Sequence, residues 1–170
     1  MFNYSPRSTR AALAGILLSC AAMPAAAEAL SSDFSFRVVE TGADGAERLV
    51  ERGSVRPGEV IHYQLRHENM TDADLSGLVI AAPVPNGVSL TIGGETTSVP
   101  ALFEVQADLD PDRAGREWST YPAMRKVYDA AGNLVEEPLP EAAIAAVRWT
   151  LLEPLEAGDV ALNTYRVRID

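Results

Sequence analysis

The sequence has very little cysteine and histidine. Among its 170 residues there are one cysteine and two histidines. A single cysteine cannot form a disulfide bond within the chain, and two histidines are too few for a histidine-rich metal site. The stability of the fold must therefore come from packing and hydrogen bonding.

Basic residues are also scarce, with 14 Lys and Arg against 24 Asp and Glu and a net charge of −10. Nucleic-acid binding needs a basic face for phosphates, and anionic membranes bind polybasic patches, so both functions are disfavoured. Hydrophobic residues make up 47% and charged residues 22% of the chain. This composition is typical of one globular domain and not of a disordered chain.

The N-terminal segment is built like an export signal. Arg7 and Arg10 precede an uncharged apolar run over 11–23, and small residues follow up to Ala27. The run is shorter than the roughly 20 residues that a membrane-spanning helix needs. This arrangement predicts a cleavable signal peptide over 1–27 and a periplasmic or extracellular protein.

Cys20 offers an alternative processing route. The segment 17–20, Leu-Leu-Ser-Cys, is similar to a bacterial lipobox, in which the cysteine becomes the lipidated first residue. Cleavage after Ala27 is favoured, because Cys20 lies inside the apolar run and an Ala-x-Ala site follows it. That cleavage would leave a chain without cysteine and, having lost two arginines and no acid, with two more units of negative charge.

The remaining chain alternates apolar and polar residues with period two and has few helical signals. Glycine, proline, asparagine and aspartate separate these runs at regular intervals, as at Pro57-Gly58, Gly93-Gly94 and 129–133. The pattern predicts an all-β fold, an antiparallel Ig-like β-sandwich of about seven to nine strands. Only 141–146 is a helical candidate, short enough to be a connector. The expected strands lie near 34–38, 61–65, 78–83, 88–92, 103–105, 124–128, 134–135, 147–151 and 165–169.

We found no internal repeat or low-complexity linker. The expected domain organisation is a signal peptide over 1–27, a short lead-in over 28–33 and one sandwich domain over 34–170. An insertion is expected at about 93–146.

Two segments resemble a bacterial family of exported repeats, domain of unknown function 11. The first is 55–69, VRPGEVIHYQLRHEN, followed by a strand and by Pro85-Asn86-Gly87. The second is 147–169, with a tryptophan strand, a Gly-Asp turn and a final strand. The chain departs from the family in its long insertion, and it has Ala81-Ala82-Pro83 where an aspartate often precedes the Pro-x-Gly.

The resemblance implies an Ig-like sandwich that serves outside the cytoplasm as a structural or binding module, with no catalytic residues and no cofactor to carry over. Trp149 and Tyr63 have the bulk to fill its core, and Asn69 can bond backbone groups at a strand end. We therefore expect a non-enzymatic component of the cell envelope that contacts another envelope protein, through strand addition at an open sheet edge.

Asp108, Asp110 and Asp112 give an alternative function, a periplasmic protein that binds a ligand or a metal. Alternate carboxylates in a loop can converge on Ca²⁺. Arg113 stands where an EF-hand loop needs glycine, which favours a solvated acidic turn.

Other candidate sites are weaker. His62 and His67 would bind a metal together with Met70 only if a bulge re-aimed one of them, because their spacing places them on opposite faces of a strand. Trp118, Tyr121 and Tyr128 could form an exposed aromatic face for a glycan or a protein.

Catalytic patterns are weaker still. No Gly-x-Ser-x-Gly elbow occurs, and Glu136-Glu137 face opposite ways in a strand.

Ion pairs with the acidic surface are expected for four basic residues, Arg116, Arg125, Lys126 and Arg148. Such pairs contribute little stability when exposed.

The export prediction has a direct test in the intact mass of the protein recovered from the cell envelope. We expect the mass of residues 28–170, because Ala27 ends the Ala-x-Ala site. A mass that fits a lipidated Cys20 would support the lipobox, and an unprocessed mass would contradict export.

Overall fold

The computed structural model describes residues 29–170. The expected signal peptide over 1–27, together with Cys20, lies outside the described residues. The first described residues lead directly into a strand at Leu30.

The described chain is all-β, as the alternating pattern predicted. It contains eleven strands and one short 3₁₀ helix. Their bounds are β1 Leu30–Thr41, β2 Glu47–Val50, β3 Val60–Asn69, β4 Val79–Pro83, β5 Val88–Thr97, β6 Ala101–Ala107, β7 Glu117–Thr120, β8 Met124–Tyr128, β9 Leu134–Pro138, η1 Glu141–Ala143, β10 Ala146–Leu151 and β11 Val160–Ile169.

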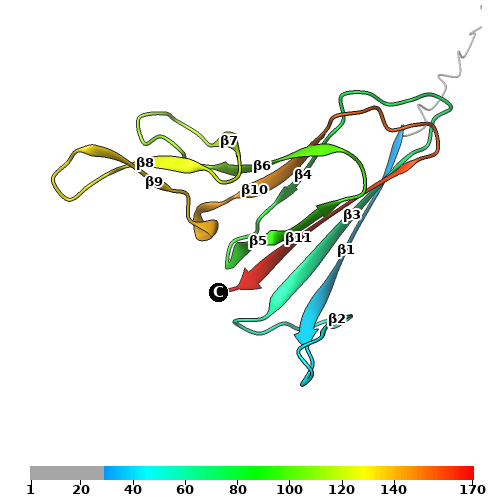
Figure 1. Ribbon diagram of the computed structural model, residues 1–170, viewed down its shortest axis with the longest axis horizontal. Coiled ribbons are helices and arrows are strands. Elements are labelled where there is room, and N and C mark those ends of the chain that lie inside the picture. Colours follow the sequence, from blue (N-terminus) through cyan, green and yellow to red (C-terminus); the bar gives the residue numbers. More distant parts are fainter. Residues whose placement is uncertain (1–28) are drawn as a thin grey trace, which may run out of the picture.

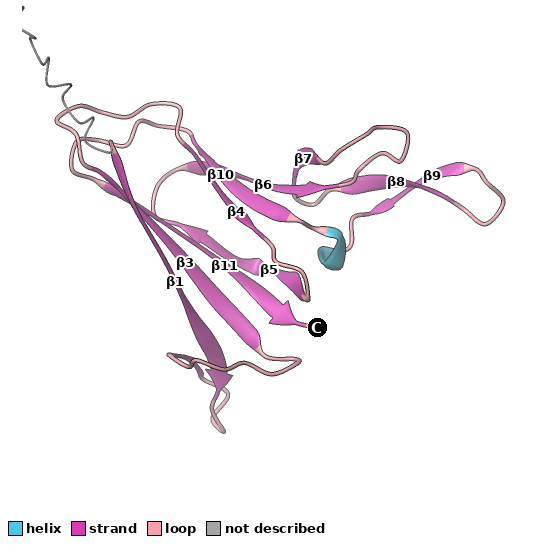
Figure 2. Ribbon diagram, turned by 180° about the vertical axis from the view of Figure 1, so that it is seen from behind, coloured by secondary structure: helices cyan, strands magenta, loops and turns pink. Residues whose placement is uncertain are grey.

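The strands form two antiparallel sheets and a separate hairpin. The first sheet has five strands in the order β2-β1-β3-β11-β5, and the second has four in the order β4-β10-β6-β7. Figures 1 and 2 show the second sheet next to the β5 side of the first sheet, with β1 and β2 at the far side. The β8–β9 hairpin extends away from the sandwich. The expected antiparallel β-sandwich is thus confirmed, and its two sheets hold nine strands.

Two expectations about local structure need correction, and the expected insertion can be described in more detail. The expected lead-in over 28–33 is mostly strand, because β1 pairs with β3 from Leu30 onward. The expected insertion over 93–146 contributes β6 and β7 to the second sheet, where β6 pairs with β10. Gly93-Gly94 is not a turn between strands but part of a bulge within β5, where the pairing with β11 shifts register.

The turn at Pro57-Gly58 has the geometry that its residues predict. The Glu59 backbone N–H donates to the Arg56 carbonyl over 3.1 Å, and Gly58 has a φ of 84°. Proline sets the φ of the first central position, and glycine accepts the positive φ of the second, so this is a tight turn that starts β3. The helical candidate over 141–146 shortens to η1, a single-turn connector.

The core lies between the sheets around Trp149 of β10 and Tyr165 of β11, each 1% exposed. Their ring centroids are 6.3 Å apart. The Tyr165 hydroxyl donates to the Pro83 carbonyl of β4 over 3.0 Å, so a buried polar group is satisfied across the two sheets. Burial raises the pKa of Tyr165, which keeps this hydroxyl protonated and able to donate.

Two buried asparagines differ in the hydrogen bonding of their side chains. The Asn69 side chain ends β3 as expected: its amide donates to the carbonyls of Leu155 and Glu156, and its oxygen accepts from Thr71 N–H over 3.0 Å. Asn163 of β11 is 0% exposed, and neither polar atom of its side chain has a partner among the described residues. Asn69 thus links the loop after β3 to the loop before β11. Burial of the Asn163 amide, in contrast, costs free energy of folding that no hydrogen bond offsets.

These two residues make a matched pair for a stability measurement. We expect Asn69→Ala to lower the free energy of unfolding by about 2–4 kcal/mol, because it leaves several buried backbone groups unpaired. Asn163→Val should be neutral or raise it by up to about 2 kcal/mol, since an apolar side chain removes the unpaired amide. Urea unfolding measures both, and an Asn163→Val loss as large as that of Asn69→Ala would contradict the assignment.

Candidate functional site

The clearest candidate site is the free edge of β1. On one side β1 pairs with β3 over Leu30–Val39. On the other side β2 pairs with it only over Val38–Thr41. Among residues 29–170 no other strand pairs with Ser31–Arg37 on this side, so the stretch presents unpaired backbone N–H and C=O groups along roughly 20 Å of strand.

Two phenylalanines stand beside this free edge. Phe34 is 55% exposed and Phe36 is 47% exposed. The register places both on the face of the sheet that also carries Val38, which is 0% exposed. These are core-facing positions that the second sheet does not cover, because it lies on the β5 side of the first sheet (Figures 1 and 2).

An aromatic row joins the exposed edge to the core. Tyr63 of β3 stacks on Phe34 with centroids 5.1 Å apart and on Tyr165 with centroids 5.0 Å apart. Tyr165 in turn packs against Trp149. Tyr63 is only partly buried, and this burial raises the pKa of its hydroxyl. A ligand that covers Phe34 would extend a row of rings that already reaches the centre of the fold.

The chain that follows β2 borders the phenylalanines. Glu51, Arg52 and Gly53 line a shallow hollow together with Phe34 and Phe36. The Arg52 guanidinium lies 2.9 Å from a Glu59 oxygen and 3.3 Å from a Glu40 oxygen.

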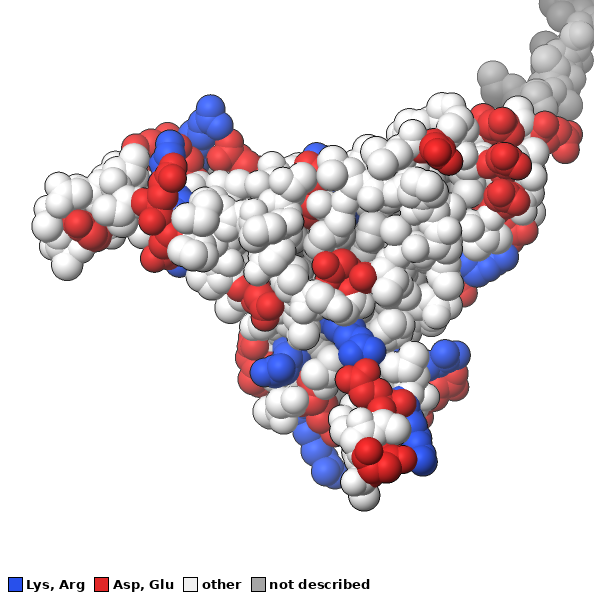
Figure 3. All heavy atoms as spheres, viewed as in Figure 1, with Lys and Arg blue, Asp and Glu red and all other residues white. Residues whose placement is uncertain are grey.

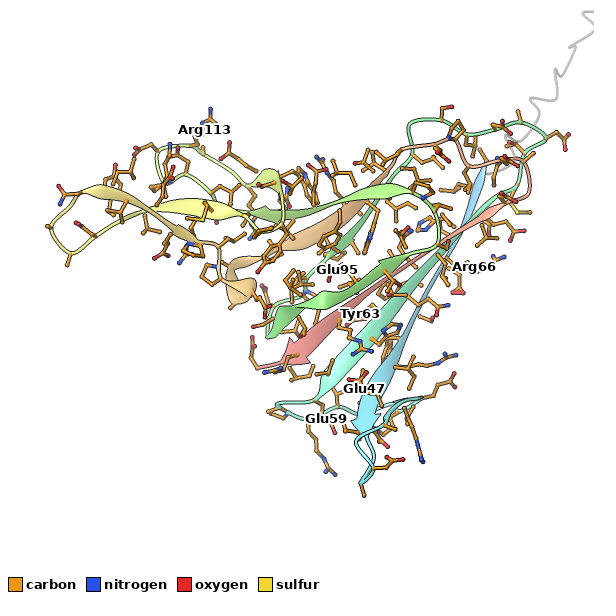
Figure 4. All side chains as sticks on the ribbon, viewed as in Figure 1. Glu47, Glu59, Tyr63, Arg66, Glu95 and Arg113 are labelled. Atoms are coloured by element: carbon orange, nitrogen blue, oxygen red, sulfur yellow. The ribbon has the colours of Figure 1, made fainter. Side chains whose placement is uncertain are left out.

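This clamp fixes the wall of the hollow. The hydrogen bond from Arg52 lowers the pKa of Glu59 and keeps it ionised. Figure 3 shows that charges of both signs gather around the β1–β2 hairpin, and Figure 4 shows Glu47 and Glu59 at this end of the sheet and Tyr63 in the middle of β3.

The other sheet edges are less open. β4 and β7 are only five and four residues long. Along β5, the Ile92 backbone N–H already donates to a Glu141 carboxylate oxygen of η1, and the strand is bulged. Short strands and bulges are common protections against strand pairing. The edge of β1 has neither, so it is suited to bind an extended segment by strand addition.

The acidic loop over Asp108–Asp112 does not gather its three carboxylates. Asp110 accepts from Lys126 Nζ over 2.9 Å, and Asp112 accepts from the Tyr128 hydroxyl over 2.8 Å. The Lys126 contact lowers the pKa of Asp110. Within residues 29–170 no group of three or more His, Cys, Asp or Glu side chains is placed to hold a metal ion. The loop thus pairs with the neighbouring hairpin.

His62 and His67 lie on opposite faces of β3, as their spacing predicted. His62 is opposite Arg37 and Arg166 on the outer face, whereas His67 is opposite Ala161 on the core-facing side. Met70 is exposed just after the strand. The structure therefore does not bring the three together.

The three aromatic residues of the insertion also lie apart. Trp118 of β7 has the Arg148 guanidinium 4.4 Å above its ring. Tyr121 packs against the core, and Tyr128 lies on the projecting hairpin. They do not form the single aromatic face that was one interpretation of the sequence.

Three of the four basic residues singled out from the sequence form ion pairs. Arg125 contacts Glu137 over 2.6 Å, Lys126 contacts Asp110, and Arg148 contacts Glu104 over 2.7 Å. The last contact lowers the pKa of Glu104. Two of these pairs join neighbouring strands, β8 to β9 and β6 to β10, and the third joins the acidic loop to β8.

Comparisons with known proteins add no relative: no family model, curated protein or solved structure matches this chain. The resemblance to the exported repeat family stays a prediction carried by the quoted residues. Over residues 29–170 the chain forms no helix with the length and apolar character of a membrane span.

Sequence reasoning did not find the β1 site. The alternation of Phe34, Phe36 and Val38 correctly placed them on one face, and a core-facing row was the natural interpretation. A signal was available in 42–58, which holds four glycines and only three large apolar residues, Leu49, Val50 and Val55, and so supports only a short strand beside β1.

The histidines predict a measurable pH dependence of stability. Burial, then the charges of Arg166 and Arg37, lower the pKa of His62, and burial lowers that of His67. The unfolded chain, with histidine pKa values near 6.5, therefore takes up protons first as the pH falls. We expect the free energy of unfolding to be at its full value above about pH 6.5 and to decline as the pH falls through the native pKa values.

Urea unfolding at several pH values between 7.5 and 5.5 would measure this decline. The variant His62→Gln/His67→Gln should show a flatter profile over the same window. Equal pH slopes in the variant and the wild type would rule out this histidine contribution.

Proposed function

We propose that this chain is a non-enzymatic, exported Ig-like module that acts as a structural or protein-interaction component of the bacterial cell envelope. The N-terminal export signal and the resemblance to exported repeats support the location. The free edge of β1 supports the mode of action. In this mode, another polypeptide pairs its backbone with Ser31–Arg37 and covers Phe34 and Phe36 with apolar side chains.

The single observation that carries the proposal is the coincidence of an unpaired strand edge with two exposed phenylalanines. Backbone hydrogen bonds supply affinity in strand addition, and side-chain pockets on alternate residues supply specificity. Exposed aromatic residues at such an edge would favour aggregation if they remained uncovered. A partner that covers Phe34 and Phe36 would bury apolar surface that the core of this chain leaves exposed.

The alternative of calcium binding at Asp108, Asp110 and Asp112 has no comparable support. Two of the three carboxylates are already hydrogen bonded to Lys126 and Tyr128.

A photo-crosslinking residue at position 36 of the exported full-length chain tests the proposal in the cell. We expect defined protein adducts from position 36, because Phe36 lies beside the free edge. The matched control is position 102, since Leu102 is also exposed but lies in β6 of the second sheet. Phe34→Ser should reduce the adducts from position 36 several-fold.

The same adduct pattern from both positions would contradict a specific interface at β1. Recovery of the protein from the cytoplasm instead of the envelope would contradict the proposed location.

A further inference from the structure

The shape of the free edge limits what can pair with it. A partner strand beside Ser31–Arg37 continues the line of β2, which ends at Val50 opposite Val38. The partner therefore cannot extend past Arg37 without displacing β2, and beside Phe36 it must also pass Glu51–Gly53, which lines the hollow with the two phenylalanines. An extended strand that pairs with this stretch must have its apolar side chains on the side of Phe34 and Phe36, and its polar side chains on the side of Asp33 and Arg37.

β1 itself has this pattern. Ser32, Phe34 and Phe36 alternate with Asp33, Ser35 and Arg37, and the first set lies on the core-facing side.

We propose that a second copy of this chain covers the edge, with the two β1 strands antiparallel about a two-fold axis at Phe34. The inference rests on the proposed function, since it names the partner that the β1 edge binds. Such a contact would join two five-stranded sheets into one continuous sheet, and a two-fold axis makes both copies use the same surface.

The register follows by elimination. Side chains that face each other across antiparallel strands must lie on the same face, so only every second register is allowed. A two-fold axis at Ser35 would place Ser32 of the other copy opposite Val38, in the place of Val50. An axis at Asp33 would set two aspartates directly opposite each other, which is destabilising. An axis at Phe34 pairs Ser31–Arg37 with itself and brings one residue of the other β1, Leu30, opposite Val38, whereas an axis at Ser35 would bring three, Leu30–Ser32, over β2.

This register is complementary on both faces. On the apolar face, Phe34 lies opposite Phe34 of the other copy, and Phe36 lies opposite the small Ser32. Aromatic pairs across strands are among the more stabilising ones. On the polar face, Arg37 lies diagonally across from Asp33 of the other copy, and long side chains reach diagonal neighbours. The symmetric contact thus creates two ion pairs and one cluster of four phenylalanines.

The first experiment measures the mass of the purified exported protein in solution, by light scattering or sedimentation, over a range of concentrations. We expect a monomer–dimer equilibrium for the wild type. Phe34→Asp should be monomeric, because it places two carboxylates on the axis. The control Leu102→Asp changes another exposed apolar residue and should still dimerise like the wild type.

The second experiment exchanges charges and does not depend on Phe34. Asp33→Arg and Arg37→Asp, each alone, should weaken dimerisation about tenfold or more, because each brings like charges together across the contact. An equimolar mixture of the two variants should restore a dimer with one copy of each, since every cross-contact then joins opposite charges. The control Glu136→Gln removes an exposed carboxylate from β9 of the projecting hairpin and should leave dimerisation unchanged.

The outcomes separate the second copy from the proposed function. A wild type that stays monomeric at high concentration overturns the second-copy inference, as does a dimer that Phe34→Asp leaves intact or a charge mixture that does not pair. If the purified chain is monomeric while position 36 crosslinks to another envelope protein, the proposed function holds and the partner is a different chain. A dimer with the expected pattern supports the inference even if no other protein is crosslinked.

Discussion

The contact between Tyr165 and its neighbours holds the fold together. Its ring lies between Tyr63 of the same sheet and Trp149 of the opposite sheet, and its hydroxyl bonds to the Pro83 carbonyl. One side chain thus combines aromatic packing within the first sheet with apolar and polar contact to the second. Because the described residues contain no cysteine and no metal-binding cluster, such contacts take the place that covalent links have in many exported domains.

The position of the contact between Tyr165 and Trp149 also determines which part of the first sheet the second sheet leaves uncovered. The second sheet lies next to the β5 side of the first sheet, where Trp149 of β10 packs against Tyr165 of β11, and it has four strands against five in the first sheet. The far side of the first sheet, formed by β1 and β2, therefore has core-type residues without a covering layer. Val38 is buried near the β2 end of β1, but Phe34 and Phe36 lie beyond the reach of β2. The exposed edge is a consequence of how the two sheets meet.

Unlike the two exposed phenylalanines, several charged residues of the insertion have partners within the chain. Acids and bases of the insertion pair with each other, as between Lys126 and Asp110 or Arg125 and Glu137, and so stabilise a segment that adds two strands and a projecting hairpin. Their mutual pairing makes a catalytic or metal role harder to support there. The unpaired groups of interest are backbone groups along β1, which is why a contact between polypeptides is the favoured function.

The sequence alone determined the faces of the strands and the positions of several turns, because side chains alternate strictly along a strand and because Pro57-Gly58 fits a tight turn that few other pairs fit. It also identified Trp149 as core and Asn69 as the residue that closes a strand end. The sequence could not determine which core-facing residues the second sheet covers. Phe34 and Val38 share a face and an apolar character, yet one is 55% exposed and the other 0%, because burial depends on where a distant sheet packs. Only the tertiary structure could decide that β1 has a free edge.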